Sequence, residues 1–229
     1  MPSSYDAEVP EFVSPPAANA ALNCQFLVAG AGLSGLSAAE AAASRGLDVI
    51  VIEKAALGKE AASGLNAGQF LTGWAKPIST VLAELTQQEQ ERGATGERAA
   101  LRALQRTREF LRRSIEGCHR LAQLDHDNNL RASVRRGAVI AAVSEADMAS
   151  LEATYEFMEQ SALRALMPAV GGRRPPFVRL LTAQELSKRC GTAHGLYAGG
   201  AIDYFGGSFR PRKFLYGLAR SLQRKGVRI

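Results

Sequence analysis

The pattern of apolar and polar positions near the start of the chain predicts a strand, a helix and a second strand. Four apolar residues from Phe26 to Ala29 are typical of a short buried strand. The small residues from Ser34 to Arg45 favour a helix that ends at Gly46, and Val49 to Ile52 form the next strand. This order indicates a βαβ unit with a parallel sheet.

The middle of the chain is predicted to be mostly helical over residues 78–130, with a break at 93–96. Residues 137–143 then favour a strand, and the helix after it is capped by Ser144 and runs through Met158. This region therefore mixes helices with at least one strand.

The last part of the chain predicts two further helices and the start of a strand. Thr182 to Glu185 matches a capping box, which marks a helix start. From Pro211 on, apolar residues recur at helical spacing, and Gly226 fits a helix C-cap. Val227 to Ile229 then alternate as a strand would.

A glycine motif joins the first strand to the first helix. Gly30 permits a tight turn, Gly32 lets a pyrophosphate approach the backbone, and Gly35 lets the helix lie close to the sheet. The helix N-terminus offers free N–H groups to phosphate oxygens. Glu53, 18 residues after Gly35, can accept hydrogen bonds from ribose hydroxyls, and its charge disfavours NADP. The motif predicts an ADP-containing cofactor but leaves NAD and FAD open.

Composition narrows the class of protein further. The net charge is +6 at pH 7, and we interpret the basic surplus as solvated helix faces, because no nucleic-acid motif accompanies it. No apolar run approaches the length that spans a bilayer, and the start lacks the features of a signal peptide. Three cysteines without CxxC spacing predict free thiols in a cytoplasmic protein. The three histidines share no metal-ligand spacing, so no metal site is predicted.

The segment after Glu53 carries a resemblance to a known family. Its sequence "GKEAASGLNAGQFLTGW", residues 58–74, resembles the "ASxxNxGQ" segment of the D-amino-acid-oxidase-like FAD-dependent oxidoreductases. The amine-oxidising branch that includes gamma-glutamylputrescine oxidoreductases is the most similar, also in "SSYDAEVP" near the start and "GGAIDYFGGSFRPRKFLYGLARSLQRKGVRI" at the end. The resemblance selects FAD over NAD.

The resemblance also implies which residues contact FAD. Leu33 and Ser34 would offer N–H groups to the pyrophosphate, which Ala62 and Ser63 approach, and Lys54 would lie beside the ribose. Ala67, Gly68 and Gln69 would reach toward the flavin. The predicted cofactor-binding residues are therefore Gly30, Ala31, Gly32, Leu33, Ser34, Gly35, Glu53, Lys54, Ala62, Ser63, Ala67, Gly68 and Gln69.

The sequence departs from the family pattern at three places. Leu65 stands where the family often has Arg, Ala67 where it has Gly, and Arg210 where it has His before Pro211. The resemblance would make the stretch that begins at Gly199 a substrate-side loop followed by a helix, and Tyr204 and Phe205 would be candidate substrate contacts. No side chain stands out as a catalytic base.

The implied fold is an α/β, doubly wound (Rossmann-like) FAD-binding domain that is incomplete, with part of a mixed α+β substrate-side region. Family members are nearly twice as long, so we expect an N-terminal portion whose apolar helix face, with Leu215, Leu218 and Leu222, is left uncovered. The expected parts are an extended arm (1–22), the βαβ unit with its flavin loop (23–77), a helical segment (78–133), a partial substrate-side region (134–208) and a helix that returns to the cofactor sheet (209–229).

The predicted function is oxidation of a small-molecule amine or amino acid by hydride transfer to FAD. The alternative is a catalytically silent fragment, or half-enzyme, that at most binds FAD or a complementary C-terminal chain. A third reading, an NAD-binding module, leaves the 58–74 segment without a purpose.

Overall fold

The computed structural model describes residues 12–13, 21–60, 62–73, 76–160 and 177–229. Most of the predicted N-terminal arm lies outside these ranges. The chain forms two compact units, each built from separate stretches. Unit 1 contains Met1–Gln69, Leu121–Arg135 and Ser208–Ile229, and unit 2 contains Phe70–Arg120 and Arg136–Gly207.

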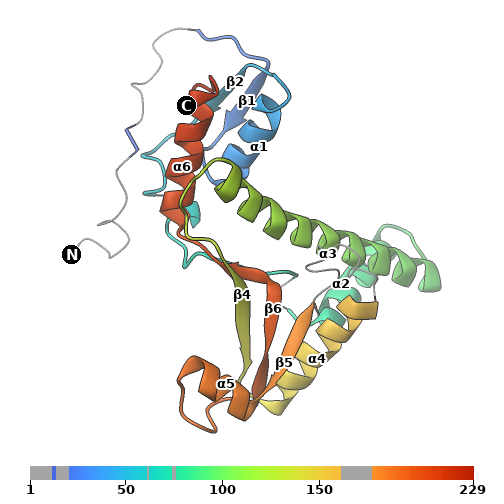
Figure 1. Ribbon diagram of the computed structural model, residues 1–229. Coiled ribbons are helices and arrows are strands. Elements are labelled where there is room, and N and C mark those ends of the chain that lie inside the picture. Colours follow the sequence, from blue (N-terminus) through green and yellow to red (C-terminus); the bar gives the residue numbers. More distant parts are fainter. Residues whose placement is uncertain (1–11, 14–20, 61, 74–75, 161–176) are drawn as a thin grey trace, which may run out of the picture. The chain divides into compact units, whose positions relative to one another are not determined.

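Unit 1 contains the predicted βαβ unit. Strand β1 (Phe26–Ala29) lies parallel to β2 (Val49–Ile52), with Phe26 opposite Val49, and α1 (Leu33–Ala43) connects them (Figure 1). After α6 (Pro211–Arg224), Arg228 forms a parallel bridge to Ile50 on β2. The predicted strand start near the end of the chain is confirmed, because Arg228 adds to the sheet of β1 and β2.

The helices of unit 1 bury one side of the sheet. Helix α1 packs against both strands and against α6, and Val49 and Val51 are each 1% exposed. By contrast, Leu27 and Ile52 are 58% and 52% exposed, so part of the sheet stays uncovered.

The expectation that the apolar face of α6 is uncovered is wrong. Leu215, Leu218 and Leu222 are fully buried. They are buried because α6 packs on α1 and on the short 3-10 helix η1 (Ala62–Gly64) within the same unit. The uncovered apolar surface of unit 1 therefore includes positions on its strands, such as Leu27 and Ile52, instead of the face of α6.

Unit 2 is organised around a four-stranded sheet in which the register of one pair of strands is antiparallel. The strand order is β3-β6-β4, and β5 also pairs with β6, with Val178 opposite Asp203. These strands are β3 (Gln69–Phe70), β4 (Arg135–Ala142), β5 (Val178–Thr182) and β6 (Gly199–Ser208). The predicted strand at 137–143 is confirmed as β4, whereas β5 was not anticipated.

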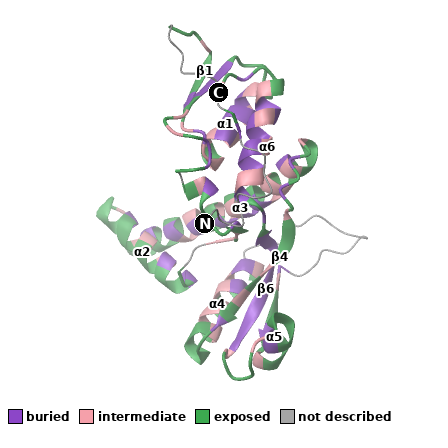
Figure 2. Ribbon diagram, turned by 90° about the vertical axis from the view of Figure 1, so that its left-hand side faces the viewer, coloured by how far each residue is buried: buried purple, intermediate pink, exposed green. Residues whose placement is uncertain are grey.

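The prediction of a loop that begins at Gly199 is wrong, because residues 199–208 form the central strand β6. Nearly all of β6 is buried, as its purple ribbon in Figure 2 shows. The glycines of β6 interrupt the alternation of apolar and polar residues that would predict a strand, but they are needed for close packing. A Cβ on Gly200 would stand 2.4 Å from the Ile140 carbonyl oxygen on the neighbouring strand.

Two of the remaining helices begin at the predicted capping signals. Thr182 and Glu185 form the expected capping box at the start of α5, and Gly191 ends that helix in the left-handed conformation. The Ser144 hydroxyl accepts from the Asp147 N–H at 3.2 Å, which confirms it as a cap. The helices of this part of the chain are α2 (Ile78–Glu91), α3 (Gly96–Asp127), α4 (Glu145–Gln160) and α5 (Ala183–Cys190).

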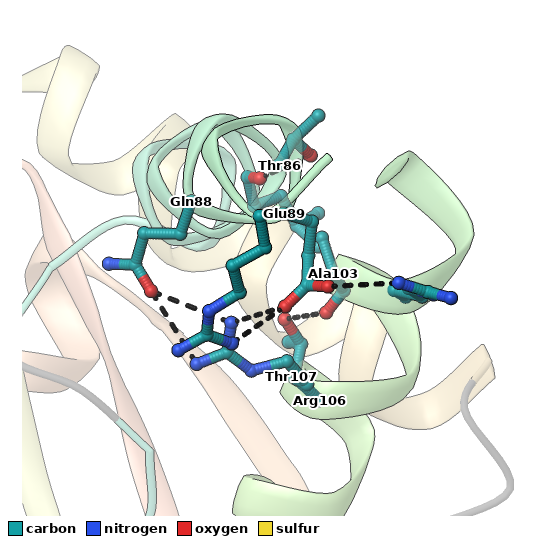
Figure 3. A network of polar contacts seen from close by, with 9 residues as sticks. Thr86, Gln88, Glu89, Ala103, Arg106 and Thr107 are labelled. Atoms are coloured by element: carbon teal, nitrogen blue, oxygen red, sulfur yellow. Dashed lines mark hydrogen bonds and ion pairs between the residues drawn. The ribbon is translucent and has the colours of Figure 1, made fainter. Parts of the chain in front are cut away.

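A buried carboxylate joins α2 to α3. The Glu89 side chain is 6% exposed, and its Oε1 accepts from Arg92 at 3.0 Å and from Arg106 at 2.8 Å (Figure 3). Arg102 on α3 lies 3.8 Å from the other oxygen. Desolvation raises the pKa of Glu89, but the hydrogen bond and charge of Arg106 and those of Arg92 outweigh it and hold the pKa below its usual range. Glu89 is therefore charged and paired at neutral pH.

We predict that Glu89→Gln lowers the melting temperature by at least about 3 °C, because removing one partner leaves its guanidinium neighbours with an uncharged acceptor. Glu91→Gln on the same helix is the matched control, since Glu91 is exposed. Thermal unfolding followed by circular dichroism measures both. Equal melting temperatures of the two variants would contradict the structural role of Glu89.

A second buried carboxylate anchors the segment after β3 to the central strand. Asp203 on β6 is fully buried. Its Oδ2 accepts from the Thr72 hydroxyl at 2.6 Å and the Thr72 N–H at 3.3 Å. Its Oδ1 accepts from the N–H groups of Phe205 at 2.8 Å and Gly206 at 3.0 Å. Four donors thus replace the water that a buried carboxylate loses.

We predict that Asp203→Asn destabilises the fold by about 1–3 kcal/mol, because an amide nitrogen would then face donors instead of accepting from them. Urea unfolding of this variant and of Thr72→Val measures the effect. The double variant should lose less unfolding free energy than the sum of the losses in the two single variants, because both substitutions act on one contact. Strict additivity would show that Asp203 does not act through Thr72.

Candidate cofactor site

The turn between β1 and α1 has the geometry that its glycines predict. Gly30 has a φ of +99°, and its N–H donates to the Ile52 carbonyl oxygen at 2.7 Å. A Cβ on Gly35 would stand only 1.9 Å from the Gly30 carbonyl oxygen. The close helix–sheet packing predicted for Gly35 is therefore confirmed, and it aims the N-terminus of α1 at the turn.

Glu53 bends back onto this turn from the end of β2. Its Oε2 accepts from the Ala31 N–H at 2.7 Å, and its Oε1 accepts from the Lys54 and Ala55 N–H groups at 2.8 and 3.3 Å. The Ala31 hydrogen bond is the largest cause that holds the pKa of Glu53 below its usual range; partial burial opposes it. Glu53 is thus an anion at neutral pH that touches the glycine turn.

The 58–74 segment approaches the same helix end. The Ser63 hydroxyl, on η1, accepts from the Leu33 N–H at 3.1 Å. A Cβ on Gly64 would stand 1.9 Å from the Gly58 carbonyl oxygen, so this segment folds tightly on itself. Asn66 fixes the next turn, because its side chain donates to the Ala62 carbonyl at 2.9 Å and accepts from the Gly68 N–H at 2.7 Å. The family-like segment therefore has a defined shape next to the glycine turn.

These parts enclose a small cleft of about 40 Å³. That volume is space for a few water molecules, so the cleft encloses only a small part of a nucleotide. Five of the predicted residues line it: Ala31, Gly32, Glu53, Lys54 and Ser63. Five others that sequence reasoning missed also line it: Ala55, Ala56, Gly58, Glu60 and Leu215. The glycines at 58 and 64 could have predicted the tight fold of this segment at the cleft. No sequence signal predicts that Leu215, on α6, also lines the cleft.

The other predicted residues surround the cleft or lie beyond it. Gly30, Leu33, Ser34 and Gly35 form the turn and the start of α1, and Ala62 precedes Ser63 on η1. Ala67 and Gln69 are exposed. Gly68 is buried with a φ of +71°, and its carbonyl oxygen accepts from the Phe209 N–H at 2.8 Å. Gly68 is needed for a close backbone approach, since a Cβ there would stand 2.0 Å from the Phe209 carbonyl oxygen.

Other candidate groups have structural surroundings. Phe205 is 1% exposed and packs against the tilted ring of Phe177 in the core of unit 2, which disfavours the substrate contact expected for it. Burial first, and the charge of Arg136 second, lower the pKa of His119. All three cysteines are free, as predicted, and burial raises the pKa of Cys118 to about 11. Across the described ranges, no group of three or more His, Cys, Asp or Glu side chains is placed to hold a metal ion, and no helix is long and apolar enough to cross a bilayer.

Comparison with known proteins places the chain in a family. Residues 25–229 match the family model described as DAO, FAD dependent oxidoreductase. The chain belongs to this family, and FAD is the cofactor of the family.

Individual relatives agree with this assignment. The chain is 26% identical over 227 residues to gamma-glutamylputrescine oxidoreductase of Escherichia coli K12, covering 99% of this chain and 46% of that protein. L-amino acid deaminase from Proteus vulgaris, with its specific insertion deleted, has a similar fold, with a TM-score of 0.64 at 21% identity. The match covers 100% of this chain and 49% of that protein. L-alpha-glycerophosphate oxidase from Mycoplasma pneumoniae, solved with FAD bound, gives a TM-score of 0.57 at 16% identity. The match covers 90% of this chain and 44% of that protein. The chain therefore spans about half the length of these relatives.

We predict that Gly35→Ala destabilises the chain by about 1–3 kcal/mol, because its Cβ forces α1 away from β1. Gly117→Ala is the control, since a Cβ there meets nothing within 4 Å and alanine favours the interior of α3. Chemical denaturation measures both variants. A Gly35→Ala protein as stable as the parent would contradict the close packing of the turn.

Proposed function

We propose that this chain binds the ADP half of FAD at the glycine turn of unit 1, as part of an oxidoreductase that acts on an amine or amino acid. The observation that carries the proposal is the meeting of three features at one cleft. These are the N-terminus of α1, the anionic Glu53 at the end of β2, and Ser63 from the family-like segment. Family membership over residues 25–229 supports the choice of FAD.

The chemistry of the cleft suits a pyrophosphate. The first N–H groups of a helix have no intrahelical partners, and the helix dipole favours negative charge at that end. At this turn, the Leu33 N–H donates to the Ser63 hydroxyl, which we interpret as standing where a phosphate oxygen would accept. Gly32 keeps the approach open, because a Cβ there would stand 3.0 Å from the Ser63 hydroxyl oxygen.

Glu53 suits the adenosine ribose. A carboxylate offers about four acceptor positions on its two oxygens, and Glu53 uses three of them on backbone N–H groups. The remaining capacity is available to a ribose hydroxyl. We further propose that Lys54 lies beside the ribose, that Ala62 helps Ser63 shape the phosphate end, and that Ala67, Gly68 and Gln69 face the flavin.

The reaction proposed for the complete system is removal of a hydride from the carbon that bears the substrate nitrogen, followed by hydrolysis of the imine. The flavin, when bound, supplies the two-electron acceptor for this oxidation. The residues of this chain would bind and orient the cofactor, and we assign none of them as a catalytic acid or base.

We predict that the purified chain is yellow and releases FAD on denaturation. We also predict that Glu53→Gln weakens FAD binding by about tenfold or more, because hydrogen bonds to a charged acceptor are stronger than those to a neutral one. Glu60→Gln removes the same charge from the same cleft and is the matched control. Titration of FAD into cofactor-free protein, followed by flavin fluorescence, measures both. A chain that binds no FAD, or equal losses in both variants, would overturn the proposal.

A second proposal is a chain that binds FAD but does not turn over substrate alone. This proposal rests on coverage, because the chain spans only about half the length of these relatives. Amine-dependent reduction of the bound FAD under anaerobic conditions separates the two proposals. Reduction by the chain alone favours a complete enzyme, and reduction only after a complementary chain is added favours a half-enzyme.

A further inference from the structure

Unit 2 contains a much larger pocket than the cleft of unit 1. It has a volume of about 620 Å³ and is lined by residues of α2, α3, α4 and β4 and by residues 71–73 and 76–77. A volume of this size falls within the range of sites for small molecules. The pocket lies within one compact unit, so its walls do not depend on the placement of the other.

The inner wall of this pocket is apolar and closely packed. Leu111 and Met158 are each 1% exposed, and Ile78 is 6% exposed. Leu151 and Ile140 are half-buried and complete the apolar surface. An apolar ligand face would therefore gain most of the binding free energy by leaving water.

The most deeply buried polar side chain of this wall is that of Tyr155. Tyr155 lines the pocket and is 7% exposed, yet none of the described residues forms a hydrogen bond with its hydroxyl. Burial, and secondarily the charge of Asp203, raise the pKa of Tyr155, so the hydroxyl keeps its proton at neutral pH. The side chain is buried as a whole, but its hydroxyl is not a fully enclosed atom, so it is open to the pocket and can donate a hydrogen bond to a ligand there.

The charged groups of the pocket lie at its exposed rim and already have partners. Lys76 forms an ion pair with Glu84 at 2.7 Å, and Asp147 caps α4 by accepting from the Ser144 hydroxyl at 2.8 Å. The charge of Asp203, which acts on Tyr155, disfavours an anion near the hydroxyl. The pocket therefore fits a neutral ligand better than an ionic one.

From these observations, we propose that the unit 2 pocket binds a neutral, mainly apolar small molecule that carries one hydroxyl or carbonyl group, which accepts a hydrogen bond from Tyr155. This site does not depend on FAD binding in unit 1. Its ligand would be held by apolar contacts with Leu111, Ile78 and Met158 and oriented by Tyr155.

The test uses two probes of nearly equal shape, 2-naphthol and naphthalene, titrated into the full chain and followed by calorimetry and probe fluorescence. We expect one site per chain, with 2-naphthol bound about tenfold more tightly, as one satisfied hydrogen bond would give. Because this comparison needs no variant, it stands even if a substitution impairs folding. The proposal is overturned if neither probe binds or if both bind equally.

Variants then locate the site. Tyr155→Phe should lower the affinity for 2-naphthol about tenfold, to that of naphthalene, and leave naphthalene binding unchanged. Tyr197→Phe is the matched control, since this half-buried tyrosine packs in a different cluster of the same unit. Leu151→Trp, which narrows the pocket one helical turn from Tyr155, should weaken the binding of both probes. Retention of the 2-naphthol preference in Tyr155→Phe would contradict the assignment.

Discussion

The cofactor region of this chain depends on one close backbone approach. The start of α1 rests against the end of β1 so tightly that the Gly30 carbonyl oxygen occupies the position of a Gly35 Cβ, at 1.9 Å. This contact fixes where the helix N-terminus points, and Glu53 reaches the turn because β2 lies parallel to β1 in register. The polar chemistry of the cleft thus follows from a steric condition that only glycine satisfies.

Two buried carboxylates play a comparable part in unit 2. Glu89 joins consecutive helices through arginine side chains, whereas Asp203 holds a segment 131 residues away in sequence through backbone and hydroxyl donors. Each carboxylate is fully engaged, which is the condition under which a buried charge is tolerated. Within unit 2, Asp203 therefore fixes Thr72 to the central strand β6.

The sequence predicted the elements whose signals are local. The strand Val49–Ile52, the capping box at Thr182 and the helix beginning at Pro211 all have their cause within a few neighbouring residues. The central strand β6 escaped prediction because its glycines break the alternation, and they are explained only by the neighbouring strands they pack against. At the site, Gly30, Gly35 and Glu53 were readable from spacing. Leu215 was not, because its place at the cleft depends on how α6 packs.

The central claim is that the glycine turn, Glu53 and the segment around Ser63 form one ADP-binding surface within unit 1. The most direct measurement is a titration of the ¹⁵N-labelled chain with ADP, followed through its backbone amide resonances. The account predicts saturable shifts centred on Ala31, Leu33 and Ser63, because these residues form the glycine turn and the phosphate end of the cleft, where the ligand would bind. Shifts centred on unit 2, or none at saturating ADP, would contradict it.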